Sequence, residues 1–493
     1  MRRPIILVLP IAAALLGGCR TVGPDYAGPP AAPPGAAFAR AGGQAGAIPD
    51  AAPSRWWTAL GDPALDRLED RALRANPNLD VARARLRQAR AALRGAHADT
   101  LPNGTATALA AHARLPRSGA APGGSGAGFR LPPSLNLYSL GFDATWEIDL
   151  FGGQRRATEA AAASAQAAEA GLADAQVSLA AEVAQAYVQL RATQARMALA
   201  AAAVARQQRI VDLTQRRVQG GTASTLDLVR LQGQLEVTRA EAEPLAAQLD
   251  ASRDALAVLA GAAPGALDGE LGAAGPDTVD AVPLPPASVP VGDPAGLLRR
   301  RPDIRAAERT LAARTAQVGQ AEAARFPHLT LLGLIGIGGT HLSDLTRLDD
   351  YSAIAAPRLT WNVLDFGRNR VRVDQAEGVR AEAEAQYRAA VLDALRDAED
   401  ALARFRQGRT TVATVARACA AAAQAATLTQ ARQRAGTASL IDVLDTERQL
   451  LAADQDLAAA RAALTGDFIS LQKALGLGWA DAAPAGGGRA ASP

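Results

Sequence analysis

The sequence predicts a mainly α-helical protein that carries a small membrane β-barrel part and arose by internal duplication. The motif at Trp146–Arg155 returns at Trp361–Arg370, and a Gly-Thr-Ala-Ser turn at Gly221 returns at Gly436, both at a shift of 215 residues. Long segments without proline carry a seven-residue apolar repeat, which is typical of coiled-coil helices. Shorter segments alternate apolar and polar residues, as strands with one apolar face do.

A second set of paired motifs lies upstream at a shift of 225 residues. Asn76-Pro77 corresponds to Arg301-Pro302, and Leu101-Pro102 corresponds to Phe326-Pro327. The first copy therefore carries about ten extra residues between its Pro102 and its Trp146. The repeat is much longer than that of a solenoid protein, so the sequence predicts two large copies of one unit.

The N-terminal residues predict an export signal that ends in a lipidated cysteine. Residues 1–18 begin with a basic pair, continue with an apolar run too short to span a bilayer, and end in Gly-Gly before Cys19. We expect cleavage there and acylation of Cys19; the alternative is an ordinary signal peptide. Arg20 stands where an inner-membrane retention signal has Asp, which predicts sorting to the outer membrane. Residues 19–61 are expected to form an extended arm.

Composition argues against several classes of protein. The formal net charge of +3 provides no basic surface for nucleic acid. No stretch of eighteen apolar residues follows the signal, which excludes a membrane-spanning helix. Cys419 falls on a seven-residue apolar repeat, which predicts a buried seam position and not a reactive thiol. The four histidines lack metal-ligand spacing, so we expect no enzyme site, no metal and no cofactor besides the lipid on Cys19.

The first repeat, residues 62–261, is expected to contain a helix, a strand hairpin and two long helices. Val183, Leu190 and Val211 follow a seven-residue spacing, which predicts a left-handed coiled-coil seam. Pro244 is expected to kink the last helix. The expected elements are a helix at 63–99, strands at 105–114 and 135–148, and helices at 154–219 and 224–260.

The second repeat, residues 294–478, is expected to follow the same order after a linker at 262–293 that is rich in proline and glycine. Residues 479–493 are expected to be a disordered tail. The expected elements of this repeat are a helix at 294–325, strands at 329–338 and 351–361, and helices at 368–434 and 439–475.

Four strands are too few to cross a membrane alone, because an exposed sheet edge would leave unpaired amides in hydrocarbon. Two chains would give eight strands and a filled interior, whereas three would give twelve strands and a water-filled lumen. The sequence therefore predicts a cyclic homotrimer in contact with outer-membrane lipid. The alternatives are a soluble protein that buries its two hairpins, and a coiled-coil spacer or adaptor.

Val22–Tyr26, Arg300–Glu308, Gly319–Pro327 and the paired motifs given above resemble the TolC superfamily, in particular its OprM/NodT-like outer-membrane efflux lipoproteins. The resemblance implies a homotrimer with a twelve-stranded β-barrel in the outer membrane and a twelve-helix α-barrel in the periplasm. It also implies passive conduction of small toxic compounds or drugs, received from a periplasmic adaptor and an inner-membrane pump of the RND type. A type I polypeptide secretion conduit and a non-pore lipoprotein adaptor are the alternative functions.

The two inter-helix turns are the candidate periplasmic gate. Both carry Ser-x-x-Asp, which ends at Asp227 in the first copy and at Asp442 in the second and is typical of a capping box. Asp445 lies on the same helical face as Asp442, whereas the first copy has Arg230 at that place. By resemblance to TolC-like channels, we expect stacked acidic rings of Asp442 and Asp445 that favour cations. Asp227 and Arg230 of the first copy would supply a different link, to the neighbouring helix.

Two further expectations concern the channel's turns. In TolC itself, aromatic and basic residues hold the closed gate together. The corresponding positions here are Gln433 and Ala438, whose side chains cannot reproduce that network. Gly152 and Gly367 are expected to redirect strand into helix, and Gly221 and Gly436 to close the helix tips. The sequence does not identify the transported compound, because the pump and not the duct selects it.

Overall fold

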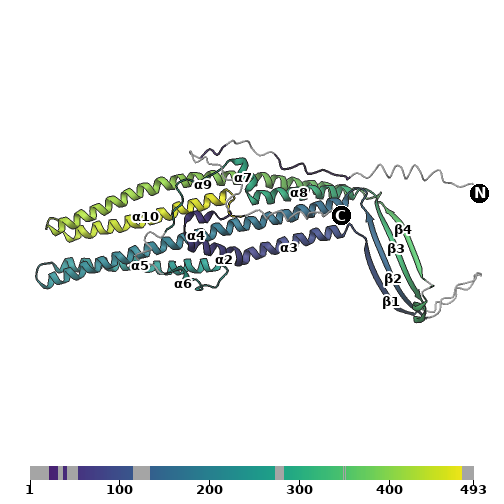
Figure 1. Cartoon of the computed structure of the whole chain (residues 1–493), viewed down its shortest axis with the longest axis horizontal. Coiled ribbons are helices and arrows are strands. Elements are labelled where there is room, and N and C mark those ends of the chain that lie inside the picture. Colours follow the sequence, from purple (N-terminus) through teal and green to yellow (C-terminus); the bar gives the residue numbers. More distant parts are fainter. Residues whose placement is uncertain are drawn as a thin grey trace, which may run out of the picture. The chain divides into compact units, whose positions relative to one another are not determined.

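The computed structural model describes residues 21–30, 37–40, 54–114, 134–272, 282–347, 349 and 351–479. The predicted signal at 1–18, the predicted lipidation site Cys19 and the tail after Trp479 lie outside the described residues. The described chain is mainly helical, with one four-stranded antiparallel sheet (Figure 1), which confirms the predicted combination of long helices and two hairpins. No helix within these residues is both long enough and apolar enough to span a bilayer.

The chain forms two compact units, and each takes residues from both repeats. The first, which we call the strand unit, comprises Met1–Pro30, Arg87–Ala167 and Glu308–Gln386. The second, the helical unit, comprises Ala31–Leu86, Ala168–Ala307 and Tyr387–Pro493. The compact units therefore do not follow the boundaries of the duplication.

The four long helices lie within about one residue of the predicted bounds. Helix α5 continues without interruption through Pro244. On α4, Val183 and Leu190 have 1% and 0% of their surface exposed, so this part of the predicted heptad seam is buried. The helices are α4 (Gly153–Gln219), α5 (Thr225–Leu259), α9 (Arg368–Arg434) and α10 (Leu440–Ala474); shorter elements that the sequence did not suggest are η1 (Trp56–Leu60), α6 (Asp268–Leu271) and η3 (Leu342–Thr346).

The first helix of each repeat is divided in two, so the expectation of single helices at 63–99 and 294–325 was wrong. Asn76 and Arg301 each precede a proline and have extended backbone, with ψ of 125° and 120°. The proline ring disfavours helical ψ at the preceding residue, which ends one helix and starts the next. The helices are α2 (Pro63–Ala75) and α3 (Pro77–Ala98) in the first copy, and α7 (Pro294–Arg300) and α8 (Pro302–Ala323) in the second.

The sheet preserves the duplication residue by residue. Its strands, β1 (Asn103–Arg114), β2 (Ser134–Ile148), β3 (His328–Gly339) and β4 (Ser352–Thr360), are antiparallel and lie in sequence order. In the first hairpin Asn103 pairs with Thr145, and in the second His328 pairs with Thr360. These partners differ by the same shifts, 225 before the hairpin loop and 215 after it. The two hairpins thus have one register.

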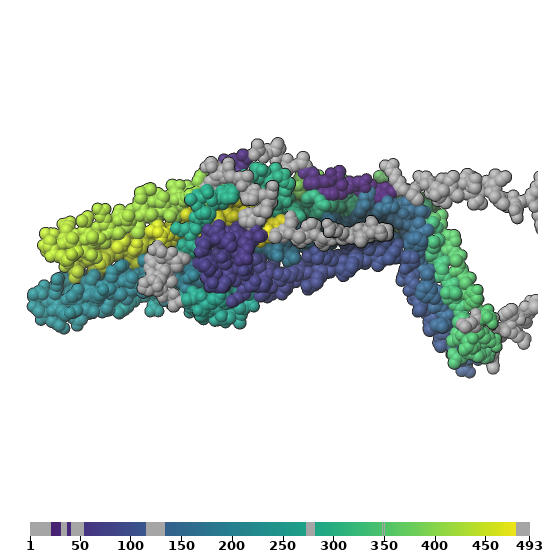
Figure 2. Space-filling view, in the orientation of Figure 1, coloured from purple at the N-terminus to yellow at the C-terminus, as the bar shows by residue number. Residues whose placement is uncertain are grey.

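One face of the sheet is apolar across all four strands. Phe142 pairs with Ala106 on one side and with Ile335 on the other, so these residues share a face, and Ile335 in turn pairs with Ala353. Phe142 and Ile335 are 49% and 50% exposed in the single chain. Figure 2 shows the blue and green strands as one continuous layer of atoms. A wide apolar face exposed on strands of 9–15 residues suits contact with lipid.

The helical unit has an aromatic core. Trp56 packs edge to face on Trp57 and on Phe468, at centroid distances of 5.8 and 5.9 Å. Tyr187 on α4 is fully buried and donates its hydroxyl to Asp62, the N-cap residue of α2, at 2.5 Å. Burial and this acceptor raise the pKa of Tyr187. The contact fixes the start of α2 against α4.

Glu69 on α2 is expected to make the helical unit less stable as the pH rises. Its side chain is fully buried, and neither oxygen has a hydrogen-bond partner among the described residues. Burial raises its pKa well above the ordinary value, and Asp70 and Asp66 raise it further. Stability is therefore full below the ordinary Glu pKa and is lost as the pH rises through the raised one.

The isosteric variant Glu69→Gln tests this expectation. Thermal unfolding followed by circular dichroism should show a gain of about 1–3 kcal/mol at pH 8 and little change at pH 4, because the amide carries no charge to bury. Asp80→Asn, on an exposed site of α3, serves as the control and should leave both values unchanged. A Glu69→Gln effect independent of pH would contradict the argument.

Cys419 is half-buried, not fully buried as the heptad predicted. Its Sγ donates to an Asp454 carboxylate oxygen at 3.1 Å. Burial, followed by the Asp454 contact, raises the thiol pKa to about 11. The thiol is therefore protonated at neutral pH, which agrees with the predicted lack of reactivity.

Candidate conduction site

The outer edges of the sheet are the first part of the site. Within the described residues, β1 and β4 each have a strand on one side and none on the other. Leu109 on β1 and Ile354 and Leu359 on β4 are 49%, 60% and 62% exposed. Unpaired amides beside apolar side chains cannot be left in hydrocarbon, so these edges require further strands.

The strand-to-helix turns use glycines in the left-handed region. Gly152 and Gly367 have φ of 84° and 86°, which residues with a Cβ adopt at a cost. Both turns are closed by tryptophan: Trp146 Nε1 donates to the Thr100 carbonyl at 3.0 Å, and Trp361 Nε1 donates to the Arg325 carbonyl at 3.1 Å. These pairs keep the 215 and 225 shifts, so each hairpin is fastened to the helix before it in the same way.

The start of the N-terminal arm, from Thr21, lies against the strand unit. The Val22 amide donates to the Phe151 carbonyl at 3.1 Å. A Cβ on Gly152 would lie 2.5 Å from the Thr21 side chain, and one on Gly23 would lie 2.3 Å from Gly319 Cα. Three glycines therefore allow the arm to approach the first strand-to-helix turn more closely than side chains would permit.

Arg156 holds this arm. Its side chain is 4% exposed and donates to the carbonyls of Val22 and Gly23, to Asp25 at 2.6 Å and to Glu159 at 2.8 Å. Burial lowers the pKa of Arg156, but Glu159 and Asp25 together raise it by more than burial lowers it, so the guanidinium remains charged. A buried cation with four acceptors, of which three belong to the arm, is a specific receptor for this segment.

The helix tips of both copies have the same construction. Gly221 and Gly436 have φ of 72° and 77° and follow the ends of α4 and α9. The Thr222 amide donates to the Arg217 carbonyl at 2.8 Å, and Thr437 donates to Arg432 at 2.9 Å. These bonds from beyond the helix to its last turn form a Schellman cap, which explains the glycine at both tips.

The gate residues lie just after these tips. The Asp442 carboxylate accepts from the Ser439 amide at 2.8 Å and closes the capping box, and interaction with the Ser439 side chain, followed by this amide bond, lowers its pKa. Asp445 pairs with Arg448 at 3.2 Å. In the first copy Ser224 caps α5 through the Leu226 amide, and no described hydrogen bond or ion pair joins Asp227 to Arg230. The side chains of Asp442 and Asp445 are both exposed in the single chain.

The positions compared with the TolC lock lie beside this turn. Gln433 is the penultimate residue of α9, and Ala438 lies between the helix tip and Ser439. Both side chains are half-buried.

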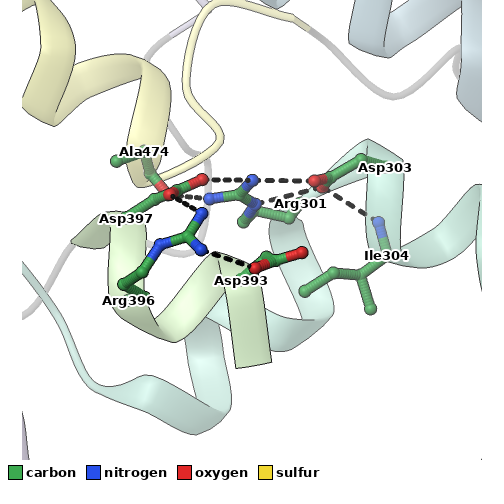
Figure 3. Close-up of polar contacts among 7 residues, drawn as sticks. All are labelled: Arg301, Asp303, Ile304, Asp393, Arg396, Asp397 and Ala474. Atoms are coloured by element: carbon green, nitrogen blue, oxygen red, sulfur yellow. Dashed lines mark hydrogen bonds and ion pairs between the residues drawn. The ribbon is translucent and has the colours of Figure 1, made fainter. Parts of the chain in front are cut away.

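A charged network in the helical unit was not predicted as a site (Figure 3). Arg301 donates to both oxygens of Asp303 at 3.0 and 2.7 Å and to the Ala474 carbonyl at 3.0 Å, and lies 3.6 Å from Asp397. It thereby joins the α7–α8 junction to α9 and to the C-terminal end of α10. The signal was present, because Arg301-Pro302-Asp303 belongs to a motif already singled out by resemblance.

The first copy has a neutral version of this link. Asn76, at the position of Arg301, donates to the Leu259 carbonyl at 2.8 Å, and Leu259 corresponds to Ala474 at the shift of 215. Each side chain before the proline thus caps the last helix of its own repeat. The duplication extends to the polar contacts of the core.

Comparison with known proteins places the chain in a family. The family model described as "Outer membrane efflux protein" matches residues 68–262 and 294–477. Nodulation protein T of Rhizobium leguminosarum bv. trifolii is 32% identical over 97% of this chain and 98% of its own length. The pyoverdine export outer membrane protein OpmQ of Pseudomonas aeruginosa is 31% identical over 86% of this chain and 87% of its own length.

Solved structures agree with the sequence comparison. The outer-membrane channel OprN is 34% identical, with a TM-score of 0.81, and the match covers 93% of this chain and 99% of that one. Its likeness includes both the long helices and the sheet, because little of either chain is left out. The chain belongs to the outer membrane efflux protein family, whose members are TolC-like channels of the outer membrane and not enzymes.

Proposed function

We propose that this protein is the passive exit duct of a tripartite efflux system, assembled as a homotrimer and anchored by a lipid on Cys19. One observation carries the proposal: a sheet of four strands has two open edges and one continuous apolar face. Three copies supply twelve strands, which is enough for a closed barrel with a water-filled interior.

The proposed duct requires partners in the periplasm and in the inner membrane. One relative is named a pyoverdine export outer membrane protein and another a nodulation protein. An outer-membrane duct needs an energy source at the inner membrane. A periplasmic adaptor and a pump of the RND type supply it. The cargo is a small molecule, and pyoverdine export by one relative supports this class over a polypeptide.

Reconstitution in a planar lipid bilayer tests the proposal. The full-length lipidated protein should insert and give steady single-channel currents, because a closed barrel leaves a continuous aqueous path. Absence of conductance from the wild type and from gate variants would contradict a duct and favour a coiled-coil adaptor.

The proposed gate makes the duct cation-selective. In the trimer, Asp442 and Asp445 supply six carboxylates around the periplasmic mouth, and the lowered pKa of Asp442 favours its charged state. Asp442→Ala/Asp445→Ala should lower the cation-to-anion permeability ratio several-fold and weaken block by multivalent cations. Bi-ionic reversal potentials and block titrations in the bilayer measure both.

The equivalent place in the first copy provides the matched control. Asp227→Ala/Arg230→Ala removes one carboxylate and one guanidinium per chain, because Arg230 stands at the position of Asp445. Since this pair has no net charge, selectivity should change much less than in the double variant. Equal permeability ratios for the wild type and the double variant would disprove the acidic rings.

A further inference from the structure

A pocket lies where the first hairpin meets its helices, wholly within the strand unit (Figure 1). It is formed by the C-terminal part of α3, the end of β2 and the first turns of α4, and has a volume of about 550 Å³. This volume is within the range of roughly 300–1,000 Å³ that is typical of pockets for small ligands. Residues of its wall include Leu93, Trp146, Ile148, Arg155, Glu159 and Ala162.

The apolar part of the wall continues the apolar face of the sheet. Trp146 and Ile148 lie an even number of residues after Phe142 on β2, so all three belong to the same face of the strand. The Trp146 indole is held by its bond to the Thr100 carbonyl, and 39% of the residue is exposed. In the proposed barrel this face contacts lipid, and the pocket opens at its end nearest the helices. The wall therefore suits a hydrocarbon chain.

The N-terminal arm begins beside this pocket. Arg155, in the pocket wall, donates to Thr21 Oγ1 at 2.6 Å. Glu159, also in the wall, accepts from Arg156 at 2.8 Å, and Arg156 in turn donates to the Val22 carbonyl. Two side chains of the wall are thus linked to the start of the arm, one directly and one through Arg156.

The predicted lipidation site is close to the same point. Cys19 precedes Thr21 by two residues, which at full extension span roughly 7 Å. We propose that the pocket binds an acyl chain of the lipid on Cys19 of the same molecule. The inference rests on the proposed lipid anchor and adds the site at which its hydrocarbon lies. A guanidinium has five N–H donors, so Arg155 can hold Thr21 and also donate to an ester carbonyl of the lipid.

The covalent tether favours this chain over the free lipids of the membrane. A hydrocarbon chain gains little apolar burial when it moves from a bilayer into an apolar pocket, so a free phospholipid has little drive to occupy the site. A chain attached two residues before Thr21 stays near the pocket at a high effective concentration. The contacts of Arg155 and Arg156 hold that tether. The pocket thereby fixes the anchor against the wall of the duct.

Photocrosslinking through the acyl chain tests the site in the full-length protein. Cells grown on a diazirine-bearing palmitate analogue attach it to Cys19 and to phospholipids, and illumination of their membranes links each chain to the residues that it touches. Mass spectrometry of the digested protein separates the two sources. The Cys19 chain joins the N-terminal lipopeptide to a second peptide, whereas a phospholipid leaves a lipid adduct. The expected product joins the lipopeptide to the segments around Leu93 and Ala162.

Two neighbouring alanines of α4 provide a variant and its matched control. Ala162→Phe should lower the yield of this product at least about fivefold, because the added ring fills the pocket. Ala161 is likewise half-buried but lies about 100° around the helix, and Ala161→Phe should leave the yield within about twofold of the wild type.

The outcomes separate the pocket from the anchor. Phospholipid adducts in place of the lipopeptide product, a lipopeptide linked to other segments, or equal yields from the two variants would overturn the pocket assignment and leave the anchor and the duct standing. A mature protein whose N-terminal mass lacks acyl chains would overturn the anchor together with the site. The wild-type product decides the assignment even where Ala162→Phe does not assemble.

Discussion

Replacing Arg301 by methionine is expected to destabilise the helical unit by about 1.5–3 kcal/mol, the usual contribution of a hydrogen bond to a charged group. The Arg301 side chain is only 12% exposed, and it neutralises Asp303 while capping the end of α10 at Ala474. Methionine keeps the length of the side chain but leaves the carbonyl without its donor and the carboxylate without its cation.

The loss should depend on pH. Burial raises the pKa of Asp174, Asp303 raises it further, and Lys473 and Arg301 lower it. A raised pKa means that stability is lost as the pH rises through it, and removing Arg301 enlarges that loss. Urea unfolding should therefore show a larger deficit at pH 8 than at pH 5.

Arg299→Met, two residues away and exposed, is the matched control and should change stability by less than about 0.5 kcal/mol. Similar unfolding midpoints for the Arg301 and Arg299 variants would show that the network in Figure 3 contributes little, and would contradict the assigned role of Arg301.

The second large effect is expected at Arg156, where methionine should release the arm. The variant loses the donors to the Val22 and Gly23 carbonyls and to Asp25. Hydrogen bonds to a charged group contribute about 1.5–3 kcal/mol each, although Asp25 is 90% exposed and its share is small. Hydrogen exchange of the peptide that covers Val22–Tyr26 should become at least about tenfold faster.

Arg155 offers a control on the same turn of α4. It is exposed and makes one contact to the arm, to Thr21 Oγ1 at 2.6 Å. Arg155→Met should therefore leave exchange at Val22–Tyr26 within about threefold of the wild type. Equal acceleration by both variants would mean that burial of Arg156 does not hold the arm.

The periodicity of apolar residues predicted the helices and strands, because these elements are determined largely by residues close together in the sequence. The heptads of α4 and α9 and the alternation in β2 gave bounds within about two residues of those observed. The breaks at Asn76 and Arg301 were missed although the prolines were visible, because the apolar pattern continues across them. The backbone restriction before proline outweighs that pattern.

Contacts between distant segments could not be predicted in this way. Arg156 lies in an alanine-rich helix that gives no sign of burial, and three of its four acceptors come from residues about 130 positions earlier. The half-buried state of Cys419 likewise depends on Asp454 of the neighbouring helix. The gate residues stood out in sequence because Asp445 differs from Arg230 of the other copy, and the single chain leaves both exposed.

The mass of the mature protein in detergent, measured by native mass spectrometry, tests the central claim most directly. The claim is that each chain completes its sheet with strands from other copies and so encloses a channel. It predicts a particle of three chains that dissociates without a stable intermediate of two. A stable single chain, or a closed pair, would contradict it.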